Sequence, residues 1–348
     1  MTLSRKRKRI FIFGSTGDLV KRKVLPALFT LTGFDVEIIA LGRRDLTTET
    51  YWDFATGGKQ PKNTLGNHAY LKVNLESDNV CEDCNKYLSK KSTNYFYSAL
   101  PPQNTAAIIG YLDKIKRQGY KVKLLTEKPF GSSLADARRL RKIIKQKKME
   151  EDVLISDHYL FKKEIVDLKN RPFKKLKIVS LEEVGLENRA GYYDDIGALK
   201  DMIQSHFLNI AFKLVGNPQK EFHNFNVIRY LRGQYGDGKK TGYACDLGKR
   251  SDTETFVHVI IKTDHKEFEF ITGKKFNEKS GYLSLDDTVI RFNHHDNPYV
   301  RLFKDFFLGK KSEFATIESS IIGWQVTEAI QKKESPLTFY SEMRPAQF

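Results

Sequence analysis

The sequence predicts a doubly wound α/β parallel sheet followed by an α+β domain whose sheet is mainly antiparallel. In the first half, short apolar runs alternate with amphipathic segments of helix length, whereas the later strand-like runs follow one another with only short turns between them. The pattern changes after about Asp157, so we expect one domain at residues 1–156 and a second at residues 157–348. The length of 348 residues fits two domains, because single cores rarely grow beyond about 300 residues.

The expected strands of the first half are short runs rich in Ile, Val, Phe and Tyr, as in strands that are buried on both faces. They span residues 10–13, 36–41, 70–73, 95–97 and 122–125. The segments between them have the length and patterning of helices and span residues 19–31, 47–54, 79–88, 105–117 and 133–147. We expect Ser133 to cap the last of these helices, with Asp136 three residues further on.

The second half begins with one long expected helix at residues 197–215. Strand-like runs follow at residues 222–231, 255–263, 267–272, 281–285 and 288–293. Short turns between consecutive strands indicate antiparallel pairing. Two further helices are expected at residues 299–308 and 316–332.

The composition is that of a folded protein with a strongly positive charge. Lys and Arg outnumber Asp and Glu by 59 to 43, which gives a net charge of +16. This charge suits either nucleic acid or an anionic substrate and cofactor, and it does not decide between them. The basic cluster at residues 5–9 is either a nuclear targeting signal or a solvated start to the first strand.

No apolar run approaches the roughly 18 residues that span a bilayer, and no apolar signal region precedes the first strand, so we expect a cytoplasmic protein.

The three cysteines are too few for a disulfide framework, which agrees with a reducing compartment. Cys81 and Cys84 form a lone CxxC motif, whereas a structural zinc site needs four ligands. We therefore expect both cysteines at the surface of a helix, and no metal site.

A glycine turn follows the first expected strand and opens the first expected helix. In a Rossmann-type domain such a turn lets the backbone approach a pyrophosphate, and the helix N-terminus supplies N–H donors. The GxxG spacing alone describes an ordinary tight turn equally well, but the position after the first strand favours dinucleotide binding. The expected cofactor-binding residues here are Gly14, Ser15, Thr16, Gly17, Asp18 and Leu19.

Arg43 and Arg44 follow the second expected strand, at the position whose side chains contact the adenine ribose of the cofactor in dinucleotide-binding folds. An acidic residue there favours NAD, and arginine favours the 2′-phosphate of NADP. No acidic residue lies between the end of this expected strand and Asp45, so the two arginines favour NADP. Exposed surface arginines without a ligand are the alternative interpretation.

Six further segments share motifs with one enzyme family: Tyr97-Ser-Ala-Leu-Pro-Pro102, Glu127-Lys-Pro-Phe-Gly131, Asp157-His-Tyr-Leu-Phe-Lys162, the block from Glu187 to His206, Gly273-Lys-Lys-Phe-Asn-Glu-Lys279, and Tyr340-Ser-Glu-Met-Arg-Pro345. In their order, and with a first turn similar to GxxGDL, they resemble the glucose-6-phosphate dehydrogenase family. The resemblance implies an NADP-dependent enzyme of the pentose phosphate pathway. That enzyme oxidises D-glucose 6-phosphate to 6-phospho-D-glucono-1,5-lactone.

His206 lies in an apolar stripe at helical spacing, which by itself fits a core histidine better than a catalytic one. The resemblance implies instead that His206 is the base that takes the proton of the anomeric hydroxyl while hydride leaves C1. Asp157 would orient and stabilise this imidazole. Without the resemblance, Asp157 and His158 could form a metal-ligand pair, but the sequence offers no matching third ligand.

The resemblance also implies residues that bind the sugar phosphate. His158, Tyr159 and a following lysine would hold the phosphate group. Because the turn at Phe161 departs from the family, Lys162 and Lys163 are both candidates for this lysine, and we choose Lys162.

The remaining residues that the resemblance implies lie on both sides of the expected domain boundary. Lys128 would lie between nicotinamide and substrate, and the peptide before Pro129 is a candidate for a cis bond. The acids matching those that bind sugar hydroxyls are Glu182 and Asp201, the further phosphate-binding residues are Lys274 and Lys279, and the further cofactor-binding residues are Tyr97 and Pro101.

The chain also departs from the family pattern. Ser205 replaces an asparagine before the base, Ala190 replaces a glycine and Lys200 replaces an arginine. The chain is shorter than typical members, with an abbreviated segment at residues 168–181 and a trimmed later sheet. Family members associate through that sheet, so the resemblance implies a homodimer, and the trimming counts against it.

Two other functions stay open from the sequence. One is a sugar dehydrogenase of the glucose–fructose oxidoreductase type, which also carries a Glu-Lys-Pro segment; the Asp157-His158-Tyr159 and His206 motifs argue against it. The other is a non-catalytic basic protein that binds nucleic acid or a partner. A decaying site would not be expected to keep its base, acid and phosphate-binding residues together, which argues against the second function.

Overall fold

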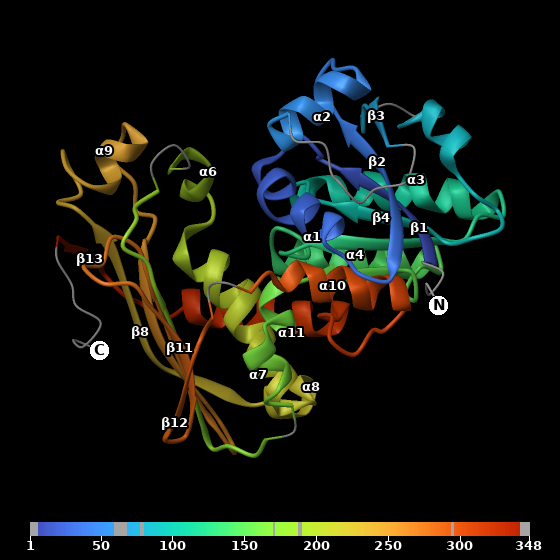
Figure 1. The fold of residues 1–348 in the computed structure, drawn as a ribbon. Coiled ribbons are helices and arrows are strands. Elements are labelled where there is room, and N and C mark those ends of the chain that lie inside the picture. The colour runs from blue at the N-terminus through green and yellow to red at the C-terminus, as the bar shows by residue number, and fades with distance from the viewer. Residues whose placement is uncertain are drawn as a thin grey trace. The chain divides into compact units, whose positions relative to one another are not determined.

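The computed structural model describes residues 6–58, 68–76, 80–169, 171–186, 190–293 and 296–341. Contacts divide the chain into two compact units (Figure 1). Unit 1 comprises Met1–Phe161 and Asn297–Ile317, and unit 2 comprises Lys162–Asp296 and Glu318–Phe348. Each unit is described by itself below.

These units differ from the linear division that we expected at residues 156 and 157. The helix α10 (Pro298–Leu308) returns to unit 1, because its aromatic face packs on that unit's sheet. The ring of Phe306 lies 5.1 Å from that of Tyr95, and the ring of Phe303 lies 5.3 Å from that of Tyr97. This return could not be inferred from the alternation of strands and helices, because it joins segments about 200 residues apart.

Unit 1 contains a six-stranded sheet in the order β3-β2-β1-β4-β5-β6. Every neighbouring pair is parallel, which confirms the predicted doubly wound sheet. The sequence missed the last strand, which has only four residues. The strands are β1 (Lys6–Phe13), β2 (Phe34–Gly42), β3 (Ala69–Lys72), β4 (Asn94–Ser98), β5 (Val122–Glu127) and β6 (Val153–Ser156).

Helices cover both faces of this sheet (Figure 1). The predicted cap of α4 is confirmed, because the backbone N–H of Asp136 donates to the Ser133 hydroxyl at 3.2 Å. The helical segments of unit 1, besides α10, are η1 (Val20–Val24), α1 (Leu25–Phe29), α2 (Thr48–Thr56), η2 (Glu82–Tyr87), η3 (Pro102–Asn104), α3 (Thr105–Arg117), α4 (Leu134–Gln146) and η4 (His158–Phe161).

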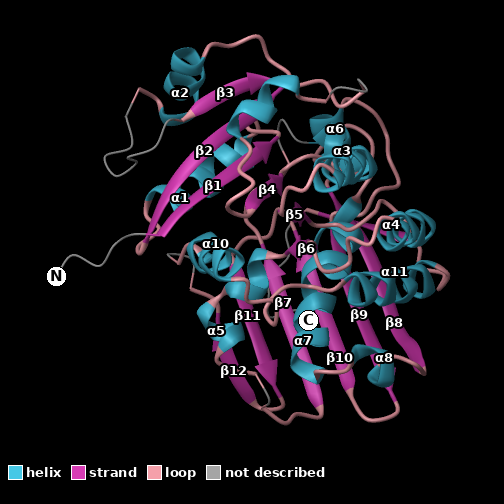
Figure 2. Ribbon diagram, turned by 90° about the vertical axis from the view of Figure 1, so that its right-hand side faces the viewer, coloured by secondary structure: helices cyan, strands magenta, loops and turns pink. Residues whose placement is uncertain are grey.

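Unit 2 contains a seven-stranded sheet in the order β12-β11-β7-β10-β9-β8-β13 (Figure 2). Its pairs are antiparallel except β7 with β10 and β8 with β13, so the predicted mainly antiparallel sheet is confirmed. The sequence missed β7, in which lysines interrupt the apolar run, and the short β13. The strands are β7 (Lys175–Leu181), β8 (Phe225–Tyr235), β9 (Phe256–Thr263), β10 (Glu267–Gly273), β11 (Ser280–Leu285), β12 (Thr288–Arg291) and β13 (Leu337–Tyr340).

The long helix predicted at residues 197–215 is divided into a π-helical segment, η6 (Leu199–Phe207), and the α-helix α7 (Leu208–Val215). The N–H of Leu208 donates to the carbonyl of Ile203, five residues earlier. Phe207 packs η6 onto the sheet, with its ring 5.8 Å from that of Phe270. The remaining helices of unit 2 are α5 (Lys163–Val166), α6 (Ala190–Asp194), α8 (Pro218–Glu221), α9 (Tyr243–Leu247) and α11 (Ile317–Gln331).

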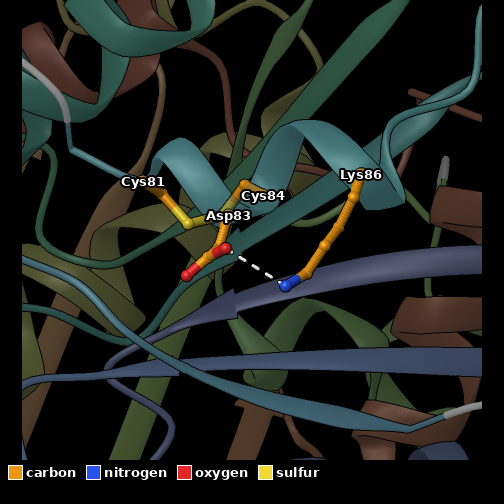
Figure 3. Close-up of a disulfide and its surroundings, with 4 residues drawn as sticks. All are labelled: Cys81, Asp83, Cys84 and Lys86. Carbon is orange, nitrogen blue, oxygen red and sulfur yellow. Dashed lines mark hydrogen bonds and ion pairs between the residues drawn. A yellow bond between two sulfur atoms is a disulfide. The ribbon is translucent and has the colours of Figure 1, made fainter.

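The expectation for Cys81 and Cys84 is wrong. Both residues are buried, and their sulfur atoms form a disulfide across the start of η2 (Figure 3). The one-turn 3₁₀ geometry brings the two Cα atoms to 5.3 Å, within the normal range for a disulfide. The third cysteine, Cys245, is exposed and reduced. Within the described part of the chain, no helix has the length and apolar character that a membrane span requires.

Candidate active site

The turn after β1 has the backbone geometry of a phosphate-binding loop. Gly14 has a φ of +75°, and a Cβ there would lie 2.9 Å from the Leu100 side chain in the loop after β4. The N–H of Gly17 donates to the Gly14 carbonyl at 3.0 Å, and the N–H of Ser15 donates to Leu41 at 3.1 Å. The first of these bonds closes the turn, and the second joins it to β2. Neither N–H group is therefore free for a ligand, and the N–H groups at the start of the following helical segment are the expected donors.

The turn after β2 lies against the first turn. A Cβ on Gly42 would meet the Tyr70 hydroxyl at 2.7 Å and a methyl of Thr16 at 3.2 Å, so only glycine fits there. The two predicted arginines follow and are exposed. The guanidinium of Arg44 lies over the Phe54 ring, 5.0 Å from its centre. Both arginine side chains are thus accessible to an anion.

Tyr97 and Pro101, predicted to bind the cofactor, lie in different environments. Pro101 is exposed in the loop after β4, whereas Tyr97 is fully buried, and its hydroxyl donates to Glu127 at 2.5 Å. Neither the side chain nor the backbone of Tyr97 is therefore exposed to a cofactor in this structure, which does not support its predicted contact.

Glu127 is a buried carboxylate at the end of β5 that sequence reasoning did not assign to the site. It accepts hydrogen bonds from Tyr97, from Ser156 at 2.9 Å and from Tyr299 at 3.3 Å. Burial raises the pKa of Glu127, although the hydrogen bonds from Tyr97 and Ser156 and the charge of Lys128 oppose the shift. The carboxylate ties the end of β5 to β6 and to α10. It thereby fixes the backbone on which Lys128 is carried.

Lys128 and Asp157 directly follow neighbouring parallel strands. The N–H of Lys128 donates to the Ser156 carbonyl at 3.2 Å, and the Lys128–Pro129 peptide is cis, as the sequence suggested. Asp157 is fully buried and accepts the N–H of Tyr159 at 3.0 Å. Because of that bond, the carboxylate is held at the beginning of η4.

His158 is positioned by a residue that the sequence gave no reason to select. Its ring stacks on that of Tyr299 in α10, with centres 5.4 Å apart and planes 15° apart. The two residues are separated by 141 positions, so no local motif could indicate this pairing.

All the predicted site residues of unit 1 lie in or directly after β1, β2, β4, β5 and β6, at the carboxyl edge of the parallel sheet. Ligands of doubly wound folds bind at this edge, where the strand order reverses. The reversal lies between β1 and β4, which carry the Gly14 turn and the Pro101 loop. Unit 1 therefore has a dinucleotide-binding edge.

In unit 2, the π-helical η6 carries both His206 and Asp201. π-Helical turns are rare and occur frequently at functional sites. His206 is buried, and Asp201 is half-buried. Ser205, which stands where the family has asparagine, donates its hydroxyl to the Asp201 carbonyl at 2.5 Å. The altered residue is thus satisfied within the helix.

Glu182 and Lys274 form an ion pair at the ends of the parallel strands β7 and β10. The two charged atoms are 2.7 Å apart, and the N–H of Glu182 donates to the Gly273 carbonyl at 2.9 Å. Lys274 is buried and Glu182 is partly exposed. A lysine and an acid that the resemblance assigned to the substrate are therefore adjacent.

Lys162 and Lys279 lie at the same end of this sheet. Lys279 precedes β11, whose first residue pairs with Leu181, and it is exposed. Lys162 is buried, with its ammonium 3.4 Å from the Asn293 carbonyl and 5.5 Å from the centre of the Phe292 ring. Phe292 in turn is bonded to Gly281 of β11. Lys163, the other candidate, is exposed in α5.

Some segments of the resembling motifs, residues 187–189 and 342–345, lie outside the described residues, as does Arg5 of the basic cluster. The other motifs lie within the described residues, and the block that ends at His206 lies in α6 and η6.

A parallel sheet with a dinucleotide-binding edge, joined to a unit that carries a histidine on a π-helical segment and an acid–lysine pair at one edge of its sheet, defines a dinucleotide-dependent oxidoreductase. The family model for the "Glucose-6-phosphate dehydrogenase, NAD binding domain" matches residues 11–167, and the model for the C-terminal domain of the same family matches residues 167–229. The chain belongs to the glucose-6-phosphate dehydrogenase family.

Individual proteins agree with this assignment. Glucose-6-phosphate 1-dehydrogenase of Rhizobium meliloti is 32% identical over 368 residues, which cover 82% of this chain and 75% of that protein. A solved glucose-6-phosphate dehydrogenase in complex with glucose 6-phosphate superposes with a TM-score of 0.79 at 21% identity, covering 99% of this chain and 96% of that one. A Gfo/Idh/MocA family oxidoreductase from Vibrio cholerae shares the fold less closely, with a TM-score of 0.60 at 10% identity over 93% of this chain and 96% of that one.

Proposed function

We propose that the protein is a glucose-6-phosphate dehydrogenase that oxidises D-glucose 6-phosphate to 6-phospho-D-glucono-1,5-lactone and reduces NADP to NADPH. This reaction is the first oxidative step of the pentose phosphate pathway. One observation carries the proposal: in a chain of this family, the π-helical η6 holds His206 and Asp201, in the unit whose sheet edge carries the Glu182–Lys274 pair.

The residues present fit a dinucleotide with a 2′-phosphate. Gly14 and Gly42 let the backbone of the first two turns pack closely against Leu100 and Tyr70, where any side chain would clash, and the adjacent Arg43 and Arg44 are exposed cations. Arginine binds phosphate through charge-assisted hydrogen bonds. The bound cofactor supplies the acceptor for the hydride that leaves C1 of the sugar.

His206 is the proposed base for the proton of the anomeric hydroxyl, and Asp157 is the proposed acid that orients its imidazole. A general base of this kind contributes about 10²–10⁴-fold to the rate. His206 is held in a buried segment of η6, and Asp157 is fixed by the backbone of η4. Both groups are thus held before substrate arrives, which a positioned base requires.

The other charged residues would bind the sugar phosphate. We propose that the phosphate group is held by His158, Tyr159, Lys162, Lys274 and Lys279, and that Glu182 and Asp201 accept hydrogen bonds from sugar hydroxyls. Lys128 would contact both substrate and nicotinamide. The burial of Lys162, against the exposure of Lys163, supports the choice between these two lysines.

We also propose a homodimer formed through the sheet of unit 2, and a cytoplasmic location. The outer face of this sheet combines apolar residues such as Leu231, which is 38% exposed, with paired charges such as Lys177 and Glu269 at 3.1 Å. Such a mixed face can associate with a second copy of itself.

The test of the proposed reaction is NADPH fluorescence on adding glucose 6-phosphate to purified, folded protein. We expect turnover with glucose 6-phosphate and NADP, with a lower KM for NADP than for NAD. Activity on unphosphorylated sugars with none on glucose 6-phosphate would favour a dehydrogenase of the glucose–fructose oxidoreductase type. No turnover with any sugar, together with salt-sensitive binding to a generic DNA duplex, would contradict an enzymatic role.

A further inference from the structure

Tyr193 lies in α6 beside the proposed substrate-binding residues and has an unusual environment. Only 4% of the residue is exposed, and its hydroxyl has no hydrogen-bond partner among the described residues. Buried hydroxyls nearly always find a partner, and leaving one without a partner costs free energy. A bound ligand can supply the hydrogen-bond partner that the described residues do not provide.

The neighbours of Tyr193 are residues that the proposed function assigns to the sugar phosphate. The Lys274 ammonium lies over the tyrosine ring, 5.6 Å from its centre, and is paired with Glu182 at 2.7 Å. Burial, followed by the nearby acidic groups of Asp201 and Glu254, raises the pKa of Tyr193 well above its usual value. The phenol therefore stays a neutral O–H donor at physiological pH.

We propose that Tyr193 is a further substrate-binding residue, whose hydroxyl donates a hydrogen bond to an oxygen of the sugar phosphate held by Glu182, Asp201 and Lys274. This inference rests on the proposed function. A sugar phosphate presents hydroxyl and phosphate oxygens on every side, so it can supply the acceptor that Tyr193 lacks within the described chain. The ring has a separate role, because its face attracts the Lys274 ammonium.

The substitution Tyr193→Phe separates these two roles, since it keeps the ring and removes only the hydroxyl. We expect the dissociation constant for glucose 6-phosphate, measured by calorimetry without cofactor, to rise about 2–10-fold, the effect of losing one hydrogen bond. The KM for NADP should not change. The urea midpoint of the ligand-free variant should stay equal or rise, because the variant loses a buried hydroxyl that has no hydrogen-bond partner within the described part of the chain.

Tyr235→Phe is the matched control. Tyr235 is also buried, but its hydroxyl donates to Asp246 at 2.6 Å and accepts the N–H of Leu186 at 3.1 Å. This variant should lower the urea midpoint and leave the affinity for glucose 6-phosphate unchanged.

The outcomes separate this inference from the proposed function. An unchanged dissociation constant for Tyr193→Phe, or a lower urea midpoint without ligand, would overturn the role of the Tyr193 hydroxyl even if the wild type is fully active. Failure of the wild type to bind or oxidise glucose 6-phosphate would overturn the proposed function itself, and the inference that depends on it.

Discussion

His206 shows how the surroundings of one residue decide between two roles. A histidine in an apolar helical stripe is ordinarily a satisfied core residue, and His206 is indeed buried. Its segment is π-helical, however, and the same segment carries a half-buried carboxylate, Asp201. A core histidine needs neither feature, so the local structure favours a functional role.

The substitution His206→Asn tests this role. We expect kcat to fall about 10²–10⁴-fold and the KM for glucose 6-phosphate to change little, because a base acts on the transition state rather than on substrate binding. Steady-state kinetics with NADPH fluorescence measure both constants.

His258→Asn provides the control for removing a buried histidine. His258 lies in β9, 3.1 Å from Glu269, and is placed outside the proposed site. The His258→Asn variant should be less stable than the wild type and should keep the wild-type kcat. Normal turnover by the His206 variant would show that another group accepts the proton.

At the scale of secondary-structure elements, a charge network joins β7, β9 and β10 on one face of the unit 2 sheet. Glu269 of β10 is paired with His258 and Lys177 at 3.1 Å and with Lys175 at 3.3 Å. The hydrogen bond from His258 has the largest effect on the pKa of Glu269 and lowers it. Burial raises this pKa, but the hydrogen bond and the contacts with Lys177 and Lys175 outweigh burial. Together they lower the pKa of Glu269 to about 2.

The substitution Glu269→Gln should lower the free energy of unfolding at pH 7 by about 1.5–3 kcal/mol, the usual contribution of a hydrogen bond to a charged group. A carboxylate whose pKa is lower in the folded state stabilises the protein above its unfolded pKa, and this contribution disappears as the pH falls from about 4.5 to about 2. Urea unfolding across this pH range should therefore show the variant and wild type converging. A difference that stays constant down to pH 2 would contradict the assignment of the network.

The disulfide of Cys81 and Cys84 constrains only a short loop. The chain-entropy relation gives about 2 kcal/mol for a loop of four residues, so reduction should lower the free energy of unfolding by no more than this amount. Urea unfolding with and without dithiothreitol measures the effect. The variant Cys245→Ser, which removes the exposed free thiol, should respond to reduction like the wild type. An equal stability of the oxidised and reduced proteins would show that the bond contributes nothing.

At the scale of the whole molecule, the proposed dimer depends on the outer face of the unit 2 sheet. The substitution Leu231→Glu places a charge on β8 within that face and should convert a dimer to a monomer, because an unpaired charge is costly to bury. Sedimentation equilibrium at micromolar concentration measures the change. Leu308→Glu, at an exposed leucine at the end of α10 in unit 1, should leave the dimer intact. A monomeric wild type would contradict the proposed dimer.

The sequence alone determined both sheet classes, most element positions and the family. Apolar periodicity and glycine turns are local signals, so helix α3 was predicted with its observed bounds, Thr105–Arg117, and the Gly14 turn was found directly. Short or lysine-interrupted strands such as β6 and β7 were missed, because their apolar signal is weak without the neighbouring strands.

Only the tertiary structure decided features that join distant residues. The return of α10 to unit 1, the stacking of Tyr299 on His158 and the gathering of Lys274 and Glu182 around Tyr193 depend on packing across many positions of the chain. Two further features are local but could not be predicted from the spacing of apolar residues. A shift of one residue in the hydrogen bonding of a helix, as in η6, changes this spacing too little to be detected. The conformation of the single turn that pairs Cys81 with Cys84 does not change the spacing at all. The residue types came from the sequence, and their spatial arrangement came from how the two sheets place the ends of their strands.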